Sequence, residues 1–240
     1  MARDFNGSSD YIDRPAGPVS TAINNFTFCC FVNLDVKISQ EIVMNGYSGG
    51  SGVGYELRFS NSSQRFQFDA AFVAAITGTT NPNTGQWYHI LGKIEGGTAY
   101  LFINGISEGT PASITPFTPA NYFAIGARRT DVGGVSGFTD GRICEVGFWN
   151  RALTSAEILS LANGYAPSFF PENLVFYSQL SGQDTPERDV KSSNILTMNG
   201  TLKSAHPDFM KYPIGPYVMT QSLNGGDKLR PRPFAPGMAR

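Results

Sequence analysis

The side chains that could perform acid–base or nucleophilic chemistry are few and stand far apart in the sequence. His89 lies in a β-like run, and His206 directly precedes a proline. A nucleophilic serine needs a histidine and an acid within hydrogen-bond reach, and neither histidine belongs to such a pattern. Glu145 is the one carboxylate of the aromatic run "RICEVGFW", so no paired acid is expected beside it. We therefore expect a protein that is not an enzyme.

Two aspartates border the Gly-rich segment 130–141 and are candidate calcium ligands. Asp131 and Asp140 supply carboxylates, and Asn121 precedes them in the chain. Calcium takes roughly six to eight oxygen ligands, usually from several carboxylates. No D-x-D cluster is present, and aspartate is also common in turns. The segment therefore holds either a calcium ion or solvated turn residues, and no other metal or cofactor is expected.

Sugar recognition is a further chemistry open to these residues, because it uses aromatic faces and planar polar groups. Tyr47, Tyr122 and the Gly-rich segment 45–54 could build a shallow glycan site. The same glycines and serines equally suit a flexible loop.

The last thirty residues, 211–240, read as an extended arm. The segment shows no sustained period and is rich in proline, which lowers the conformational entropy an arm loses on docking. Composition alone is equally typical of a disordered tail. As an arm, it would contact its partner, either its own domain or a neighbouring subunit, through Tyr212, Tyr217, Met219, Arg230, Arg232 and Phe234.

Composition and charge exclude several classes of partner. The net charge is −1, which argues against the clustered lysine and arginine of a nucleic-acid surface. No stretch approaches the roughly 20 apolar residues of a membrane span. The first residues lack the apolar segment of a secretory signal. The three cysteines cannot form a disulfide framework, so we expect reduced, buried thiols.

Period-two patterns and turn pairs predict a protein built almost entirely of β-strands. Segment 26–34 alternates apolar residues on one face, and 55–59 and 65–72 do the same. Gly96-Gly97 and Asn104-Gly105 suit tight hairpin turns, so strands over 87–94 and 99–103 should pair, with another strand turning back after Gly105. Further strands are expected over 122–129, 142–150 and 173–180, with one or two more within 195–209. In the second of these, we expect Cys144, Val146 and Phe148 to share one face.

One short helix interrupts this β pattern. Thr154 and Glu157 have the spacing of a capping box, in which each side chain satisfies a backbone N–H group of the other residue. Ile158 and Leu161 form its apolar stripe, and Gly164 ends it. So short a helix is unstable alone in water and must dock on the strands.

Three segments in this order resemble the laminin-G-like domains of the concanavalin A-like superfamily, which are related in shape to pentraxins. The first is F-x-G-x-x-x-Y from Phe5 to Tyr11, and the second is a tryptophan strand leading into the Asn104-Gly105 turn. The third and most specific is "WNRALTSAEI", from Trp149 to Ile158. The resemblance covers roughly residues 5–164.

The resemblance implies an all-β, two-sheet jelly-roll sandwich with one short helix and an extended C-terminal arm. We expect a laminin-G-like sandwich over 1–168, a C-terminal β extension over 169–210 and the arm over 211–240; whether the extension completes the sandwich or forms a separate lobe is left open. Members of this family often hold calcium at one rim. Glucan-hydrolysing enzymes of the superfamily carry an E-x-D-x-x-E strand, of which only Glu145 is present here.

The extension resembles those of laminin-G-like proteins from bacteriophages and bacteria. With free thiols and no expected secretory signal, this implies a non-enzymatic virion protein made in the host cytoplasm. The expected role is capsid decoration or cementing, through contacts with the major capsid protein and with copies of itself. The alternative is a carbohydrate- or receptor-binding module of a phage tail or fibre, whose binding either requires calcium or does not. Neither reading involves nucleic acid or a membrane.

Overall fold

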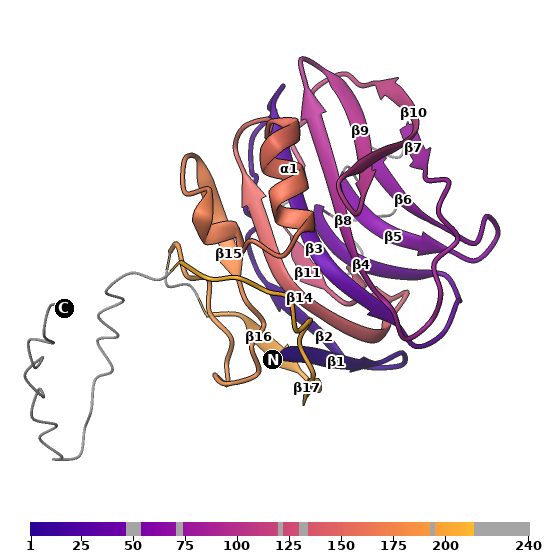
Figure 1. Cartoon of the computed structure of the whole chain (residues 1–240). Helices are drawn as coiled ribbons and strands as arrows, with labels where there is room; N and C mark the ends of the chain where they lie inside the picture. The colour runs from indigo at the N-terminus through magenta and orange to yellow at the C-terminus, as the bar shows by residue number, and fades with distance from the viewer. Residues whose placement is uncertain (47–53, 71–73, 120–121, 130–133, 193–194, 214–240) are drawn as a thin grey trace, which may run out of the picture.

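The computed structural model of the chain describes residues 1–46, 54–70, 74–119, 122–129, 134–192 and 195–213. Within them, two antiparallel sheets face each other (Figure 1). In spatial order, the first sheet contains β10 (Ile106–Ser113), β9 (Thr98–Ile103), β8 (Trp87–Glu95), β3 (Phe26–Leu34), β14 (Asp140–Trp149), β1 (Ala2–Asn6) and β17 (Leu202–Ser204). An eighth strand, β15 (Leu174–Ser178), also pairs with β14.

The second sheet contains, in spatial order, β16 (Thr197–Asn199), β2 (Tyr11–Arg14), β11 (Phe123–Ile125), β4 (Gln40–Gly46), β5 (Gly54–Ser60), β6 (Arg65–Ala70) and β7 (Ala74–Thr77). A two-stranded ribbon of β12 (Arg128–Arg129) and β13 (Val135–Ser136) stands beside it. The sandwich confirms the expected concanavalin A-like fold class.

Aromatic side chains on the inner faces of both sheets form the core. Phe28 of the first sheet packs edge-to-face on Phe68 of the second, with ring centroids 5.5 Å apart. Phe148 stacks on Phe28 at 5.1 Å and meets Phe123 of the second sheet at 5.5 Å. These contacts follow from the period-two pattern that the sequence shows in β3 and β6, because alternate side chains of a strand share a face.

The predicted hairpins and helix are confirmed. Gly96, Gly97, Asn104 and Gly105 all adopt positive φ, as two-residue hairpin turns between twisted strands require. The second turn leads into β10, the strand that was expected to turn back after Gly105.

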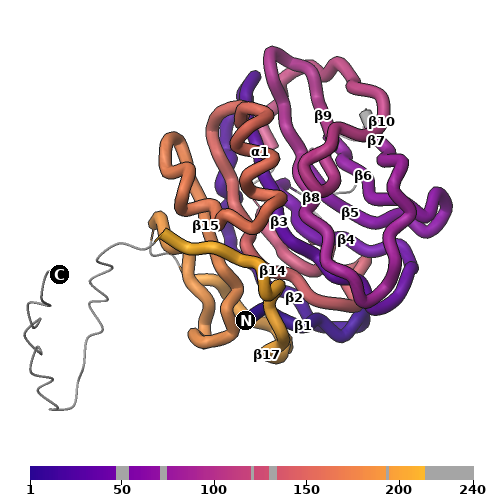
Figure 2. Tube along the Cα trace, in the orientation of Figure 1, coloured from indigo at the N-terminus to yellow at the C-terminus, as the bar shows by residue number. Residues whose placement is uncertain are grey.

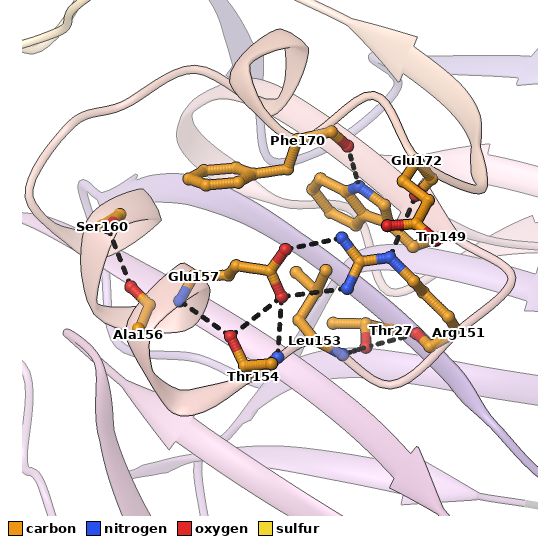
Figure 3. A network of polar contacts seen from close by, with 10 residues as sticks. All are labelled: Thr27, Trp149, Arg151, Leu153, Thr154, Ala156, Glu157, Ser160, Phe170 and Glu172. Atoms are coloured by element: carbon orange, nitrogen blue, oxygen red, sulfur yellow. Dashed lines mark hydrogen bonds and ion pairs between the residues drawn. The ribbon is translucent and has the colours of Figure 1, made fainter.

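Helix α1 (Ser155–Ala162) begins with the predicted capping box and packs on the outer face of the first sheet, followed by the short 3-10 helix η1 (Pro167–Phe169). Figure 3 shows how it is held: Arg151 pairs with both oxygens of Glu157, at 2.6 and 2.9 Å. The Thr154 hydroxyl accepts from the Glu157 N–H group at 3.3 Å. Ile158 and Leu161 are buried, as predicted.

Strand β14 departs from the predicted alternation at Glu145. The pairing of β14 with β3 shifts between Cys144 and Gly147, so two residues face one, which is a β-bulge. Glu145 takes φ +55°, a left-handed conformation uncommon for a residue with a side chain. Ile143 and Val146 therefore point into the core with Phe148, whereas Cys144 points outward; the prediction that Cys144 shares a face with Val146 is wrong.

The segment after η1 adds strands to both sheets. Strand β15 extends along β14, β17 pairs with β1 at an edge of the first sheet, and β16 pairs with β2 at an edge of the second. Figure 2 shows the N-terminus and these late strands gathered at one end of the molecule. The C-terminal extension thus adds an edge strand beside β1 in the first sheet and another beside β2 in the second.

Candidate functional site

A spacious cavity lies on the outer face of the second sheet, where β2 and β16 pair. Tyr11 lies directly opposite Asn199, and Asp13 lies directly opposite Thr197. Ile12, which lies between Tyr11 and Asp13 in β2, is buried in the core, so these two neighbours must face outward. These two cross-strand pairs form the floor of a cleft, named the β2–β16 cleft after the strands that line it.

Residues from three other places complete the cleft. Pro15 follows β2, Tyr122 precedes β11, and Arg129 comes from β12; the cavity that they enclose with the floor measures about 600 Å³. Its volume falls within the range typical of small-molecule sites, roughly 300–1,000 Å³.

The polar groups of the cleft hold one another in place. Asp13 Oδ2 lies 3.2 Å from Arg129 Nη1, and the Asn199 amide donates to Asp13 Oδ1 at 3.4 Å. The Arg129 guanidinium also lies 5.7 Å from the centroid of the Tyr122 ring, a cation–π distance. Burial raises the pKa of Asp13, although Arg129 opposes this. Charge in the cleft is therefore balanced within one ion pair.

This set of side chains suits a polyhydroxylated ligand of low charge. Tyr11 and Tyr122 supply aromatic surface, and Phe138 stands 6.3 Å from the Tyr11 ring. Carboxylate, amide and guanidinium groups offer planar arrays of donors and acceptors for hydroxyl groups. An apolar and aromatic lining with a few fixed polar groups is the usual composition of a ligand site.

A second polar cluster lies buried on the outer side of β4, β5 and β6. Arg128 Nη2 contacts Glu41 Oε1 at 2.5 Å and Glu56 Oε2 at 3.3 Å, and Arg58 pairs with Asp69 at 2.7 Å. Burial raises the pKa of Glu56 well above its usual value, and the neighbouring Glu41 carboxylate adds to this. Both glutamates thus contact the same guanidinium from two neighbouring strands. Burial favours the protonated form of each, and Arg128 and Arg58 offset the charge that remains.

A third cluster surrounds Glu145, which is only 1 % exposed. Its carboxylate accepts hydrogen bonds from the hydroxyls of Tyr177 at 2.7 Å and Tyr212 at 2.8 Å. The ring of His206 lies 3.1 Å from Glu145 Oε1. The sequence did not reveal these partners, because the β14 bulge turns Glu145 outward to meet residues that follow it by 32 to 67 positions.

The other residues that the sequence suggested as sites do not lie together in the structure. Tyr122 lines the cleft. Asp140 begins β14 beside Asp35, and burial and that neighbour raise its pKa. Within the described ranges no group of histidine, cysteine or acidic side chains has the arrangement of a metal site. Outside those ranges lie Asn121, Tyr47, Asp131, and the arm residues Tyr217, Met219, Arg230, Arg232 and Phe234.

Cys29, Cys30 and Cys144 are all buried and free, as predicted. Burial raises the pKa of each thiol, which keeps it protonated and unreactive. Among the helices of the described residues, none is long and apolar enough to cross a membrane.

Comparison with known proteins agrees with the fold. A laminin-G profile, described as the concanavalin A-like lectin/glucanases superfamily, matches residues 6–159. No sequence among functionally curated proteins matches the chain.

Among solved structures, a candidate carbohydrate-binding protein from Bacteroides ovatus shares 22% identity at a TM-score of 0.66; the match covers 84% of this chain and 58% of that protein. Domain 4 of the extracellular arabinanase AbnA of Geobacillus stearothermophilus, solved with arabinotriose, shares 22% identity at a TM-score of 0.51, covering 67% and 76%. A heptameric pentraxin from Limulus polyphemus shares 16% identity at a TM-score of 0.50, covering 67% and 81%.

Proposed function

Because the chain belongs to the concanavalin A-like lectin/glucanases superfamily, we propose that it is a carbohydrate-binding module whose ligand lies in the β2–β16 cleft. The observation that carries the proposal is the pairing of two tyrosine faces with the Asp13–Arg129–Asn199 array in one cavity. Two similar structures support it, since one is described as a candidate carbohydrate-binding protein and the other was solved with a bound trisaccharide.

We also propose that the module binds without catalysis. Glycoside hydrolysis uses two carboxyl groups at least about 5 Å apart, so that a sugar or a water fits between them. Glu41 and Glu56 are both buried against the Arg128 guanidinium, so neither carboxyl group faces a space that a sugar could enter. The Glu145 carboxylate is occupied by two tyrosine hydroxyls and a histidine. This supports the expectation of a non-enzymatic role.

A glycan microarray followed by calorimetry tests the binding proposal. Wild-type protein should bind at least one neutral oligosaccharide, and Tyr122→Ala should weaken that binding about tenfold or more, because stacking surface is lost. Tyr100→Ala is the matched control, since Tyr100 is a half-buried tyrosine on the first sheet. Equal affinities of the two variants, or no binding anywhere on the array, would contradict the proposal. Repeating the titration with calcium and with chelator tests the calcium expectation.

A role in a virion, as a capsid decoration protein that contacts the major capsid protein and its own copies, is a second proposal. One observation favours an arm whose first residue is anchored to the domain. The Lys211 N–H group donates to the Gly164 carbonyl at 2.7 Å, and the Ala166 N–H group donates to the Lys211 carbonyl at 3.0 Å. This anchor lies on the first sheet, so the arm and the cleft could act independently. Light scattering of the full chain against a chain ending at Pro213 tests self-association through residues 214–240; two monomers would count against it.

A further inference from the structure

A smaller cavity continues the β2–β16 cleft along the strands. It measures about 290 Å³ and is lined by Arg14, Pro15, Ala16 and Ile195. Pro15 lines both cavities, so they share a wall. From Tyr11 to Pro15 is four strand steps, or about 13 Å at ~3.3 Å per residue. The two cavities, together called the groove, thus adjoin at Pro15 just after the end of β2, and they span more than one sugar ring.

The two halves of the groove differ in chemistry. Around Tyr11 and Asn199 the lining is aromatic and polar, whereas around Pro15 and Ile195 it is apolar. Ile195 is 58 % exposed, so its side chain is available at the surface.

Arg14 does not bring a free charge to the apolar half. Its guanidinium lies 5.3 Å from the Phe176 ring centroid and 3.4 Å from Asp189 Oδ2. Both Phe176 and Asp189 are buried, so these contacts hold the guanidinium on the inner side of the sheet. The apolar cavity thus meets the stem of Arg14 rather than its charge.

Such a lining selects against charged and hydroxyl groups. A sulfate or carboxylate placed against Pro15, Ala16 and Ile195 would lose hydration without gaining a partner. A methyl group would gain from leaving water. On an otherwise polar sugar, an acetyl substituent places a methyl group at the end of a short polar link, which fits a polar cleft that opens into a small apolar pocket.

We propose that the groove binds an acetylated, uncharged oligosaccharide, with a sugar ring over Tyr11 and Asn199 and the acetyl methyl group against Pro15, Ala16 and Ile195. This inference rests on the proposed carbohydrate-binding function and specifies its ligand class. Ile195 is then a specificity-determining residue, while Tyr122 contributes to binding of any sugar.

Matched pairs of oligosaccharides test the inference by calorimetry. Chitotetraose is compared with cellotetraose, and acetylated xylo-oligosaccharides with the same material after saponification. Wild-type protein should bind the acetylated member of a pair about tenfold more tightly, the usual effect of a methyl-sized group in a fitted pocket. Ile195→Asp should abolish this preference and keep affinity for the unacetylated member. Ile106→Asp, at another exposed isoleucine on β10, should leave the preference unchanged.

The outcomes separate this inference from the function on which it rests. Binding of both members of each pair with equal affinity, lost in Tyr122→Ala, would overturn the acetyl pocket and leave the carbohydrate site intact. A preference that persists in Ile195→Asp would also overturn it. If no member of any pair binds but another sugar on the array does, the inference is wrong and the proposed function stands. If nothing on the array binds, both are wrong.

Discussion

Asn199 lies directly opposite Tyr11 on neighbouring antiparallel strands, and together they form one rung of the floor of the β2–β16 cleft. Tyr11 belongs to the superfamily match, whereas Asn199 lies beyond its end at residue 159. The cleft is therefore assembled from the family domain and from an extension that follows it. This relationship makes the extension part of the proposed binding site as well as part of the sandwich.

Asn199→Ala should weaken oligosaccharide binding about fivefold to tenfold without unfolding the protein. The substitution removes the amide that donates to Asp13 and takes a planar polar group out of the floor, a loss of about 1 kcal/mol. Titration calorimetry measures the affinity, and thermal unfolding checks the fold. Lys203→Ala, on the neighbouring short strand β17, is the control and should bind like wild type. Unchanged affinity in Asn199→Ala would remove β16 from the site.

Tyr212→Phe should loosen the segment that follows β17. This change removes the 2.8 Å hydrogen bond to Glu145, whose buried carboxylate then keeps only Tyr177 and His206 as side-chain partners. Loss of a hydrogen bond to a charged group costs about 1.5–3 kcal/mol. We expect faster amide exchange over 205–212, measured by mass spectrometry. Tyr165→Phe is the control, because its aromatic contact with Phe169 does not need the hydroxyl. Equal exchange rates in the two variants would show that the Tyr212–Glu145 hydrogen bond does not stabilise this segment.

His89 should make the fold sensitive to mild acid. Burial lowers the pKa of His89 from 6.5 to about 3, so the folded protein keeps this ring neutral while the unfolded chain protonates it. Stability is therefore lost as pH falls from 6.5 towards 3, at up to about 1.4 kcal/mol per pH unit.

Replacement of the ring tests this account. Neither ring nitrogen of His89 has a hydrogen-bond partner in the described part of the chain. His89→Leu should therefore show a flatter stability profile between pH 7 and pH 4 in urea unfolding. His206→Gln serves as the comparison at the partly buried histidine beside Glu145. Parallel profiles for wild type and His89→Leu would refute the assignment.

Glu157→Gln should destabilise the protein at neutral pH by about 1 kcal/mol, the usual value of a helix cap. Hydrogen bonds from Arg151 hold the pKa of Glu157 at about 2, below its ordinary value of 4.5. The carboxylate's contribution is thus present above pH 4.5 and disappears as pH falls to about 2. Unfolding experiments should show a gap between variant and wild type at pH 7 that closes at pH 2. A gap of the same size at both pH values would contradict this prediction.

Local signals in the sequence predicted most of the elements that frame the site. The Gly96-Gly97 and Asn104-Gly105 turns and the capping box of α1 depend on residues a few positions apart, so they can be read directly from the chain. The alternation of β3 and β6 likewise predicted which side chains form the core.

The sequence did not reveal the partners of Glu145 or the full β2–β16 cleft, because both depend on residues that are distant in the chain. The partners of Glu145 lie 32, 61 and 67 residues away, and the bulge that turns it outward is a property of its pairing with β3. Tyr122 was identified as a candidate sugar contact, but Tyr11 and Asn199 come from opposite ends of the described chain. Only the register of β2 with β16 brings them together, and periodicity within one strand carries no information about that register.

The most direct test of the central claim is a crystal structure of the protein with the oligosaccharide that binds most tightly on the array. The account predicts sugar rings in the β2–β16 cleft, packed on Tyr11 or Tyr122 and hydrogen-bonded to Asp13, Arg129 or Asn199. A sugar bound at any other surface, with this cleft free of ligand, would contradict it.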